Sequence, residues 1–271
     1  MSAHLTRIVL PLLLGLLAGC NTGSPGAGQR KFSAGPPAGG PAGLRIAAVS
    51  DVAHGFGQSG ETFVWVSDPA LDAPRLFMDT GGGLVDTTLA PLPPFSPGAA
   101  APGELLFQVT APRGARLQVR GTRAGAPAES NVVTVGATPT APGVTILSPR
   151  GRFEAPFVPP PVVPAPSEAT WTAPQVDRFL VILFSVDVFN QPNVSGRFNR
   201  IERVVELPGT TTRFAWGDSG LVTYRAGPSI PGNLPAGAWA LSVSGLDASG
   251  WGFSTSNDPS GLGGLFEFEV R

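Results

Sequence analysis

The stretch Arg178-Phe-Leu-Val-Ile-Leu-Phe-Ser-Val-Asp-Val-Phe189 decides the fold of this chain. It lies in a segment, 175–191, that has neither Gly nor Pro, although the 271 residues include 36 Gly and 30 Pro. Up to Phe184, apolar residues occupy the positions of both strand faces. A strand with one face in water would instead alternate apolar with polar residues. We therefore expect a β-strand covered on both faces. The cover is the insertion 190–230, the other domain or a partner, and the insertion is favoured because it is nearest in sequence.

Outward from this stretch, short apolar runs alternate with turn residues, and helical periodicity is almost absent. Gly and Pro make up about a quarter of the chain, which excludes a helical bundle, and 42% hydrophobic with 14% charged residues excludes a disordered chain. The sequence predicts an all-β fold of antiparallel β-sandwiches. The expected strands are 44–50, 62–67, 75–79, 105–110, 115–121, 131–135, 144–147, 169–172, 178–189, 203–207, 211–216, 221–225, 239–245 and 265–270.

An internal repeat divides this strand-rich region in two. Pro112-Arg-Gly-Ala-Arg-Leu-Gln-Val-Arg-Gly121 recurs, with one residue inserted, as Pro235-Ala-Gly-Ala-Trp-Ala-Leu-Ser-Val-Ser-Gly245. Two copies at matching positions predict two related sandwich domains, 46–137 and 143–271, joined by a short Pro-containing linker. The proline-rich run 157–166 is expected to be an extended loop or a sheet edge, because proline cannot donate to a strand ladder.

The second domain carries three segments that are typical of one known family. They are Ala169-Thr-Trp-Thr-Ala-Pro174, the run 178–184, and Leu234-Pro-Ala-Gly-Ala-Trp239 with its following strand and turn. On these residues the domain resembles a fibronectin type III domain, apart from Trp239 at a position where tyrosine is usual and the insertion after Asn190. The first domain is similar to immunoglobulin-like domains, with Trp65 as the counterpart of Trp171. The resemblance implies that both tryptophans are core residues.

The N-terminus predicts where the protein is located. A basic segment ending at Arg7 and the apolar run 8–17 form a signal peptide, which ends in Leu17-Ala18-Gly19-Cys20. This ending resembles the lipobox of bacterial lipoproteins, and Cys20 is the only cysteine. The alternative is an ordinary cleaved signal with a chance cysteine.

The lipobox resemblance implies cleavage after residue 19 by the type II signal peptidase. It also implies a diacylglycerol and an N-acyl lipid, such as palmitate, on Cys20. Residues 20–45 then form a flexible Gly- and Pro-rich tether. We expect a bacterial cell-envelope protein, extracytoplasmic and lipid-anchored to the outer leaflet of the cell membrane or to the outer membrane. The balance of 18 basic against 19 acidic residues argues against a nucleic-acid partner.

Catalytic and metal-binding residues are few. Without the signal peptide, His54 is the only histidine, and no thiol is free, so we expect no zinc site, no other metal and no cofactor besides the covalent lipid. Gly217-Asp-Ser219-Gly220 is similar to the nucleophile motif of chymotrypsin-like proteases, and His54 with Asp79 or Asp86 would complete a triad. The same four residues also suit a hairpin turn, which is the favoured interpretation.

Carboxylate groups offer two further candidates. Glu202 with Glu206, and Glu267 with Glu269, occur at strand alternations and are expected on a solvated sheet face. A calcium site from Asp247, Asn257 and Asp258 at the final turn is conceivable, since loop oxygens suit that ion.

Two tryptophans outside the expected core are candidates for ligand binding. Trp216 adjoins the expected hairpin turn, and Trp251 lies between glycines before the last strand. Such residues stack on sugar rings or anchor protein partners, although both could equally pack onto their own sheets. The sequence thus favours a non-enzymatic role in adhesion, scaffolding or binding of an envelope protein. The alternatives are a carbohydrate-binding module for envelope polysaccharide and a serine hydrolase using Ser219 and His54.

Overall fold

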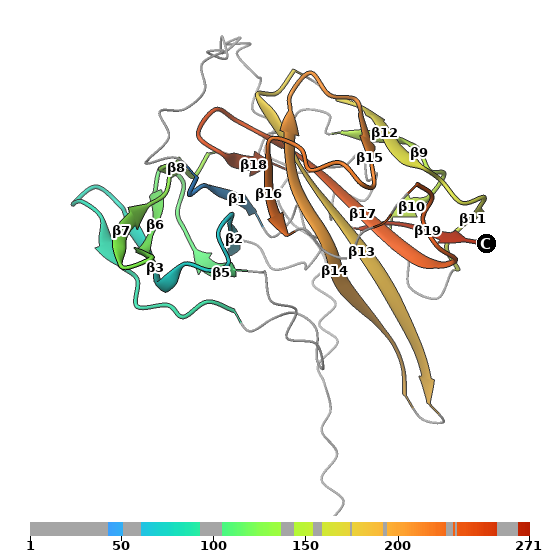
Figure 1. Ribbon diagram of the computed structural model, residues 1–271, viewed down its shortest axis with the longest axis horizontal. Helices are drawn as coiled ribbons and strands as arrows, with labels where there is room; N and C mark the ends of the chain where they lie inside the picture. The colour runs from blue at the N-terminus through green and yellow to red at the C-terminus, as the bar shows by residue number, and fades with distance from the viewer. Residues whose placement is uncertain are drawn as a thin grey trace, which may run out of the picture. The chain divides into compact units, whose positions relative to one another are not determined.

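The computed structural model describes residues 43–50, 61–92, 105–136, 144–153, 159–173, 175–191, 194–225, 230, 232–253 and 265–271. By contact the chain divides into two units, Met1–Lys31 and Phe32–Arg271, and all of these residues belong to the second. Their regular elements are all strands, so the expected all-β fold is confirmed (Figure 1). No helix in the described ranges is long and apolar enough to cross a membrane.

Sandwich 1 is built from eight strands in two layers. One layer contains β1 (Ile46–Ser50), β2 (Glu61–Val66) and β5 (Leu105–Thr110). The other contains β3 (Asp72–Asp79), β4 (Val85–Asp86), β6 (Arg116–Arg123), β7 (Ala126–Glu129) and β8 (Val133–Thr134). Between them lies the first core, which includes Ile46, Val64, Phe107 and Leu117.

Sandwich 2 follows the same plan with a larger second layer. Its small layer contains β9 (Thr145–Ser148), β12 (Glu168–Thr172) and β15 (Arg213–Ala215). Its large layer contains β13 (Arg178–Gln191), β14 (Val194–Pro208), β16 (Val222–Arg225), β17 (Gly237–Leu246) and β19 (Phe266–Val270), with β10 (Arg152–Phe153) and β11 (Val162–Val163) on β19. In both sandwiches a layer of three strands faces a layer of more strands, as in immunoglobulin-type sandwiches.

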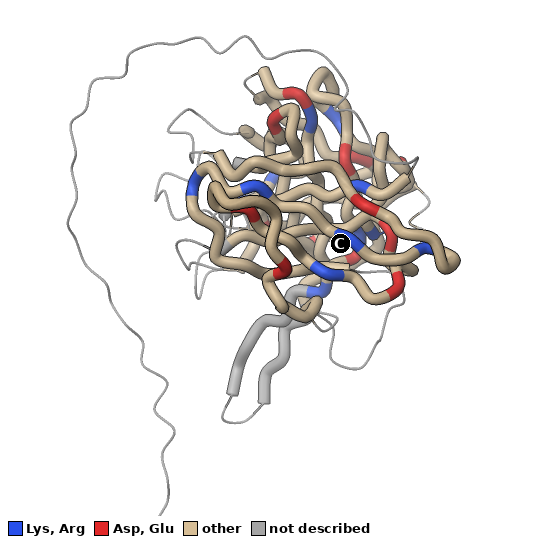
Figure 2. Tube along the Cα trace, turned by 90° about the vertical axis from the view of Figure 1, so that its left-hand side faces the viewer, with Lys and Arg blue, Asp and Glu red and all other residues tan. Residues whose placement is uncertain are grey.

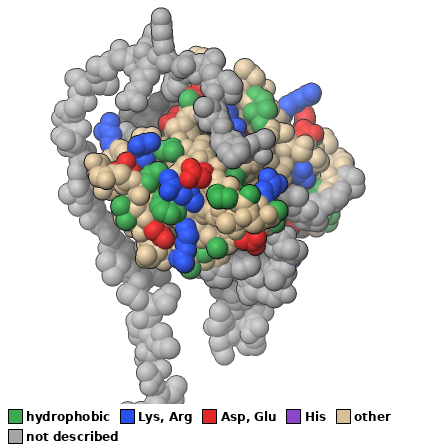
Figure 3. Space-filling view, turned by 60° about the vertical axis from the view of Figure 1, so that its left-hand side comes forward, with side chains coloured by type: hydrophobic (Ala, Val, Ile, Leu, Met, Phe, Trp, Pro, Cys, Tyr) green, Lys and Arg blue, Asp and Glu red, His purple; other side chains and the backbone are tan. Residues whose placement is uncertain are grey.

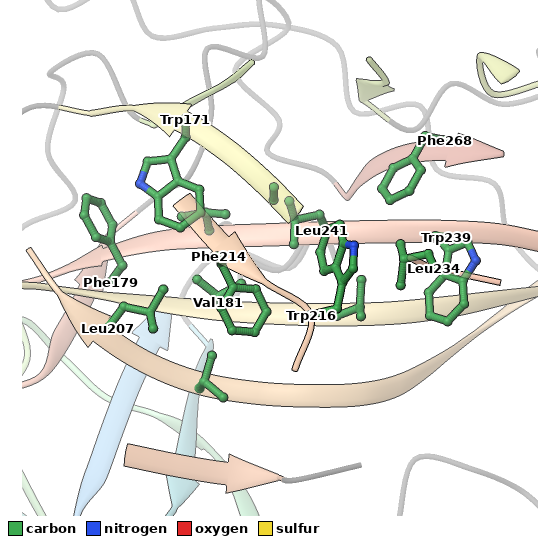
Figure 4. Packing of buried hydrophobic residues seen from close by; sticks show 14 of the residues in the cluster. Trp171, Phe179, Val181, Leu207, Phe214, Trp216, Leu234, Trp239, Leu241 and Phe268 are labelled. Atoms are coloured by element: carbon green, nitrogen blue, oxygen red, sulfur yellow. The ribbon is translucent and has the colours of Figure 1, made fainter. Parts of the chain in front are cut away.

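The second core fills the space between these two layers. Figure 4 shows Trp171, Phe179 and Phe214 turned toward one another, with Trp216 further along the same layer. The rings of Trp171 and Phe179 meet edge to face at a centroid distance of 5.5 Å. The expectation that Trp171 is a core residue is confirmed.

A short strand, β18 (Trp251–Phe253), joins the two sandwiches. It pairs antiparallel with β17 and parallel with β1, through Leu246↔Gly252 and Ala48↔Trp251. A continuous path of eight paired strands therefore runs from β16 to β5, and β10, β11 and β19 bring the sheet to eleven strands. The sequence predicted antiparallel sheets. Two pairings differ from this prediction, because β1–β18 and β11–β19 are parallel.

A third hydrophobic cluster, called the middle cluster here, lies between the halves of this sheet. Sandwich 1 contributes Ala47, Val49, Phe63, Trp65 and Leu106 to it, and β13 contributes Leu180, Ile182, Phe184 and Val186. The expectation that both faces of β13 are covered is confirmed, but the insertion is not the main cover. Its strands β14 and β16 extend the sheet sideways, and sandwich 1 covers the face.

Side-chain parity explains where each tryptophan lies. In β2, Val64 and Val66 enter the first core, while Phe63 and Trp65 face the opposite way into the middle cluster. Trp65 is therefore buried but is not the counterpart of Trp171, because successive residues of a strand point to opposite faces.

Each of the fourteen expected strands has an observed counterpart. The very short strands β4, β10, β11 and β18 were not predicted, nor was β7. Within the proline-rich run, β11 pairs only with β19 and is an edge strand, as expected for residues 159–166. The strands of sandwich 1 lie within residues 46–137, and those of sandwich 2 lie within 143–271. One strand of the second range, β18, also pairs with β1 of sandwich 1.

Candidate functional site: a buried charge cluster between the sandwiches

A group of four polar side chains lies at the contact between the sandwiches, and we call it the seam cluster: Arg45, Arg178, Glu206 and Tyr224. Glu206 is fully buried in β14. Its Oε1 accepts a hydrogen bond from Arg45 Nη2 at 3.1 Å, and its Oε2 accepts one from the Tyr224 hydroxyl at 2.8 Å. Arg178 Nη1 lies 3.0 Å from the same Oε1.

Strand register puts these groups on the face of the sheet that turns toward sandwich 1. Leu180 is opposite Glu206 and belongs to the middle cluster. Arg178, two residues before Leu180, shares its face, and Tyr224 belongs to the middle cluster itself. The seam cluster therefore forms the polar end of the contact between the two sandwiches, which the middle cluster otherwise makes apolar.

Burial raises the pKa of both titratable groups of the seam cluster, and their neighbours act differently on each. Burial raises the pKa of the Glu206 carboxyl, while the Arg45 guanidinium and the Tyr224 hydrogen bond lower it. Burial also raises the pKa of Tyr224 well above its ordinary value, and the Glu206 carboxylate adds to that rise. The Tyr224 hydroxyl thus keeps its proton at neutral pH and donates a hydrogen bond to Glu206 Oε2.

Arg178 links this cluster to the turn that precedes β18. Its Nη2 donates to the carbonyl oxygens of Asp247 and Ala248, at 3.1 and 2.9 Å. Within the turn, Asp247 Oδ1 accepts four hydrogen bonds, from the backbone N–H groups of residues 249–251 and from the Ser249 hydroxyl. The turn is therefore fixed in a conformation that directs β18 toward β1.

On the other side of this turn, sandwich 1 holds β18 through Asn131. The Asn131 amide accepts from the Ile46 N–H at 2.8 Å and donates to the carbonyl oxygens of Ile46 and Ser249, both at 3.1 Å. The Ala48 N–H donates to Gly250 O at 3.0 Å. Polar contacts thus run from Arg45 through Glu206 and Arg178 to the edge of sandwich 1.

The chemistry of the seam cluster suits a structural role. Two guanidinium groups, one carboxylate and one protonated phenol supply no activated nucleophile. A buried carboxylate between cations is costly to desolvate and is stable only in a defined geometry. The cluster therefore disfavours any other arrangement of the two sandwiches.

Sequence reasoning missed all four members of the cluster. Glu206 was expected on a solvated face, and this is wrong because sandwich 1 covers that face. The sequence did contain a sign of this buried site. Arg178 is two residues from Leu180, and Glu206 is two residues from Val204, so each charged residue shares a strand face with an apolar one. Ionisable residues at apolar alternations call for a buried partner.

The other carboxylates of the expected solvated faces also differ from expectation. Glu202 is buried, and its Oε1 accepts from the Ser185 hydroxyl and from Arg200 Nε, at 2.5 and 2.8 Å. Glu267 is 1% exposed and lies opposite Arg152 of β10. Glu269 alone keeps a partly exposed carboxylate, which pairs with Arg271 Nε at 2.9 Å. The expectation of a solvated face was wrong for Glu202 and Glu267, because both side chains are buried.

Trp216 lies inside sandwich 2. Its side chain is fully buried, and its Nε1 donates to Pro166 O at 2.8 Å. Its ring meets Phe214 edge to face, with centroids 6.1 Å apart. No ring face is open to a ligand, and the residue packs onto its own sandwich.

Trp251 lies inside sandwich 1, although residue 251 belongs to the second expected domain, 143–271. It is 4% exposed and belongs to the first core. A Cβ added at Gly136 would stand 2.8 Å from Trp251 Cδ1, which shows how closely the chain packs on the ring. Neither candidate tryptophan therefore presents a stacking surface in this conformation.

The segment around Ser219 is not a hairpin turn, which corrects the expectation. Residues 217–220 connect β15 in the small layer to β16 in the large layer, so the flanking strands do not pair. Arg203 Nη2 holds the segment by donating to the carbonyl oxygens of Gly217 and Asp218, at 3.2 and 2.7 Å. His54 lies outside the described residues, so the hydrolase hypothesis stays a prediction.

The remaining candidates fall largely outside the described ranges. Cys20, the signal peptide and the tether up to residue 42 are among them, as are Asn257 and Asp258 of the calcium hypothesis. Asp247 Oδ1 is already engaged by its own turn. Within the described ranges, no group of three or more His, Cys, Asp and Glu side chains could hold a metal ion.

The charged side chains of sandwich 1 are mostly paired with opposite charges. Arg116, Arg120 and Arg123 pair with Asp79, Glu129 and Asp68, at 3.4, 3.3 and 3.1 Å. Figure 2 shows basic and acidic positions interspersed along the described trace, and the face seen in Figure 3 likewise mixes both signs.

Comparisons with known proteins add little to this picture. No protein-family model matches the chain, and no curated protein matches it. Among solved structures, the crystal structure of chicken CNTN1 FN1–FN3 domains is similar, with 10% sequence identity and a TM-score of 0.22. The match covers 83% of this chain and 66% of the chicken chain, just under two thirds of its length. The class of the protein is defined by its own strands: an all-β chain of two joined β-sandwiches.

Proposed function

We propose that this chain is a bacterial lipoprotein, held on the extracytoplasmic side of the cell envelope by lipid on Cys20. The observation that carries this proposal is Leu17-Ala18-Gly19-Cys20 at the end of a short apolar run, with the only cysteine of the chain at the acylated position. A Gly- and Pro-rich tether leads from that position to the joined sandwiches.

In this proposal the folded part is a non-enzymatic module for adhesion, scaffolding or binding of an envelope protein or polysaccharide. The fibronectin type III-like character of sandwich 2 supports it, since such a sandwich serves as a scaffold for loops that bind. The continuous sheet, the middle cluster and the seam cluster support one further feature. They join the two sandwiches by strand pairing and by packing, and in this proposal the loops of both sandwiches are presented together.

The anchor is tested by metabolic labelling with palmitate and by membrane fractionation. The wild-type chain is expected to take up label, to require globomycin-sensitive processing and to sediment with membranes. Cys20→Ala is expected to lose all three, and Ser24→Ala in the tether is the matched control that keeps them. Unchanged labelling and fractionation of Cys20→Ala would contradict the proposal.

A further inference from the structure

Two carboxylates converge on the turn of residues 247–250, which leads from β17 into β18. Asp247 Oδ1 accepts hydrogen bonds from the backbone N–H groups of residues 249, 250 and 251, at 2.8, 3.1 and 3.0 Å. The Ala248 N–H instead donates to the carboxylate of Asp177. Asp177 reaches this turn because it precedes Arg178, which pairs with Leu246. The conformation of the turn therefore depends on both carboxylates.

The backbone of Asp177 is fixed, whereas part of its carboxylate lacks a donor. The Asp177 N–H donates to Leu246 O at 3.2 Å, and its carbonyl oxygen accepts from the Gly209 N–H at 3.0 Å. Within the described residues, Asp177 Oδ2 is buried and has no hydrogen-bond partner. A buried carboxylate oxygen without a donor is costly, and a proton on the group removes that cost.

The cations of this region contact other groups. Arg178 Nη2 donates to the carbonyl oxygens of Asp247 and Ala248, and its Nη1 lies 3.0 Å from Glu206 Oε1, which also binds Arg45. From sandwich 1, the turn is held by the uncharged amide of Asn131, which donates to the carbonyl oxygen of residue 249. In the described part of the chain, the charge that acts on Asp177 is the like charge of Asp247.

These surroundings change the affinity of Asp177 for a proton. Burial raises the pKa of its carboxyl, and the charge of Asp247 raises it further, while the Ala248 N–H lowers it. The net direction is upward from the ordinary pKa of 3.8. The folded turn thus holds this proton more tightly than an open chain does. Stability from this proton is present at low pH and is lost as pH rises through the raised pKa.

We propose that Asp177 is a proton switch for the turn 247–250 and, through β18, for the contact between the two sandwiches. Protonation takes one proton from solvent, forms an O–H bond on Asp177 and leaves Asp247 as the one negative charge at the turn. The turn then holds β18 firmly against β1. When the proton is lost, the two carboxylates repel each other and the turn opens more often, which also releases the pairs Ala48↔Trp251 and Val49↔Gly252. Only exposure of the switch to the pH outside the cytoplasm rests on the proposed function.

Hydrogen-exchange mass spectrometry of the purified full chain tests the switch. The measured quantity is the protection of β18 and β1 divided by the protection of β12, because a ratio within one molecule cancels the pH dependence of the exchange chemistry. In the wild type, this ratio is expected to be about three- to tenfold higher at about pH 4 than at about pH 7.

Three variants assign the response to Asp177. Asp177→Asn removes the titrating charge in nearly the same shape and is expected to give the high ratio at both pH values. Asp177→Ser also lacks the charge and is expected to show the same flat response, so the test does not depend on the folding of one variant. The matched control is Asp72→Asn, at an exposed carboxyl of β3, which is expected to keep the wild-type response.

Other results would overturn the switch. These are a wild-type ratio that does not change with pH, uncharged variants of Asp177 that keep the wild-type response, and a response that is lost in Glu206→Gln but not in Asp177→Asn. Palmitate labelling reports the anchor and hydrogen exchange reports the turn, so failure of one proposal is distinguishable from failure of the other.

Discussion

At the scale of single residues, the unusual feature is one buried carboxylate between two guanidinium groups. Glu206 has almost no exposed side-chain surface, Arg178 has little and Arg45 is about one quarter exposed. Removing the central charge would leave two cations facing each other without a counter-ion. Such a loss is much more costly than that of an exposed pair.

We expect Glu206→Gln to lower the free energy of unfolding by about 3 kcal/mol, because breaking a buried ion pair leaves an uncompensated charge. Urea unfolding followed by tryptophan fluorescence measures the change. The matched control is Glu269→Gln, the same substitution in an exposed ion pair, which is expected to cost less than about 1 kcal/mol. Equal losses from the two variants would contradict the role of the seam cluster.

How much of this site the sequence reveals differs from residue to residue. Arg178 and Glu206 occupy apolar alternations, so a buried ion pair could have been inferred from strand parity. Arg45 could not, because it lies at the end of a Gly- and Pro-rich segment and meets Glu206 across 161 positions of sequence. Contacts of that range follow from the packing of whole sandwiches and have no local pattern.

At the scale of elements, β18 has three residues and pairs with both sandwiches. Long strands were predictable because their apolar alternation is visible in the chain. The strands β4, β10, β11 and β18 were not, since two or three residues are too few to show such an alternation. The flanking glycines of Trp251 indicated a loop, and the pairing with β1 makes that loop a strand.

We expect Trp251→Ala to destabilise sandwich 1, although residue 251 belongs to the second expected domain. Loss of a buried tryptophan typically costs about 3–5 kcal/mol. Hydrogen-exchange mass spectrometry is expected to show faster exchange in β5 and β6. The matched variant Trp216→Ala is expected to show it in β12 and β15. The prediction fails if Trp251→Ala loosens β12 and β15 instead.

At the scale of the whole molecule, three apolar clusters stand in series across four layers of strands. The middle cluster draws on both sandwiches, and β18 continues the sheet from one to the other. Domains joined by a flexible linker would show separate cores and move independently. Here the two sandwiches share a sheet and a core.

We therefore expect the two sandwiches to unfold in one cooperative transition. Scanning calorimetry should give equal calorimetric and van't Hoff enthalpies. Leu106→Ala, in the middle cluster, and Leu183→Ala, in the second core, should both shift that one transition to lower temperature. Two resolved transitions, with only one of them moved by Leu183→Ala, would show that the sandwiches unfold independently.

The position of Trp251 in the first core has a consequence for biosynthesis. A ribosome makes the chain from its N-terminus, so every strand of sandwich 1 is synthesised well before the side chain that completes its interior. Until residue 251 has emerged, sandwich 1 exposes an unfilled apolar surface and the edge of β1 that later pairs with β18. The nascent chain must avoid aggregation during that interval. Sandwich 1 completes its folding only after the C-terminal segments have been synthesised.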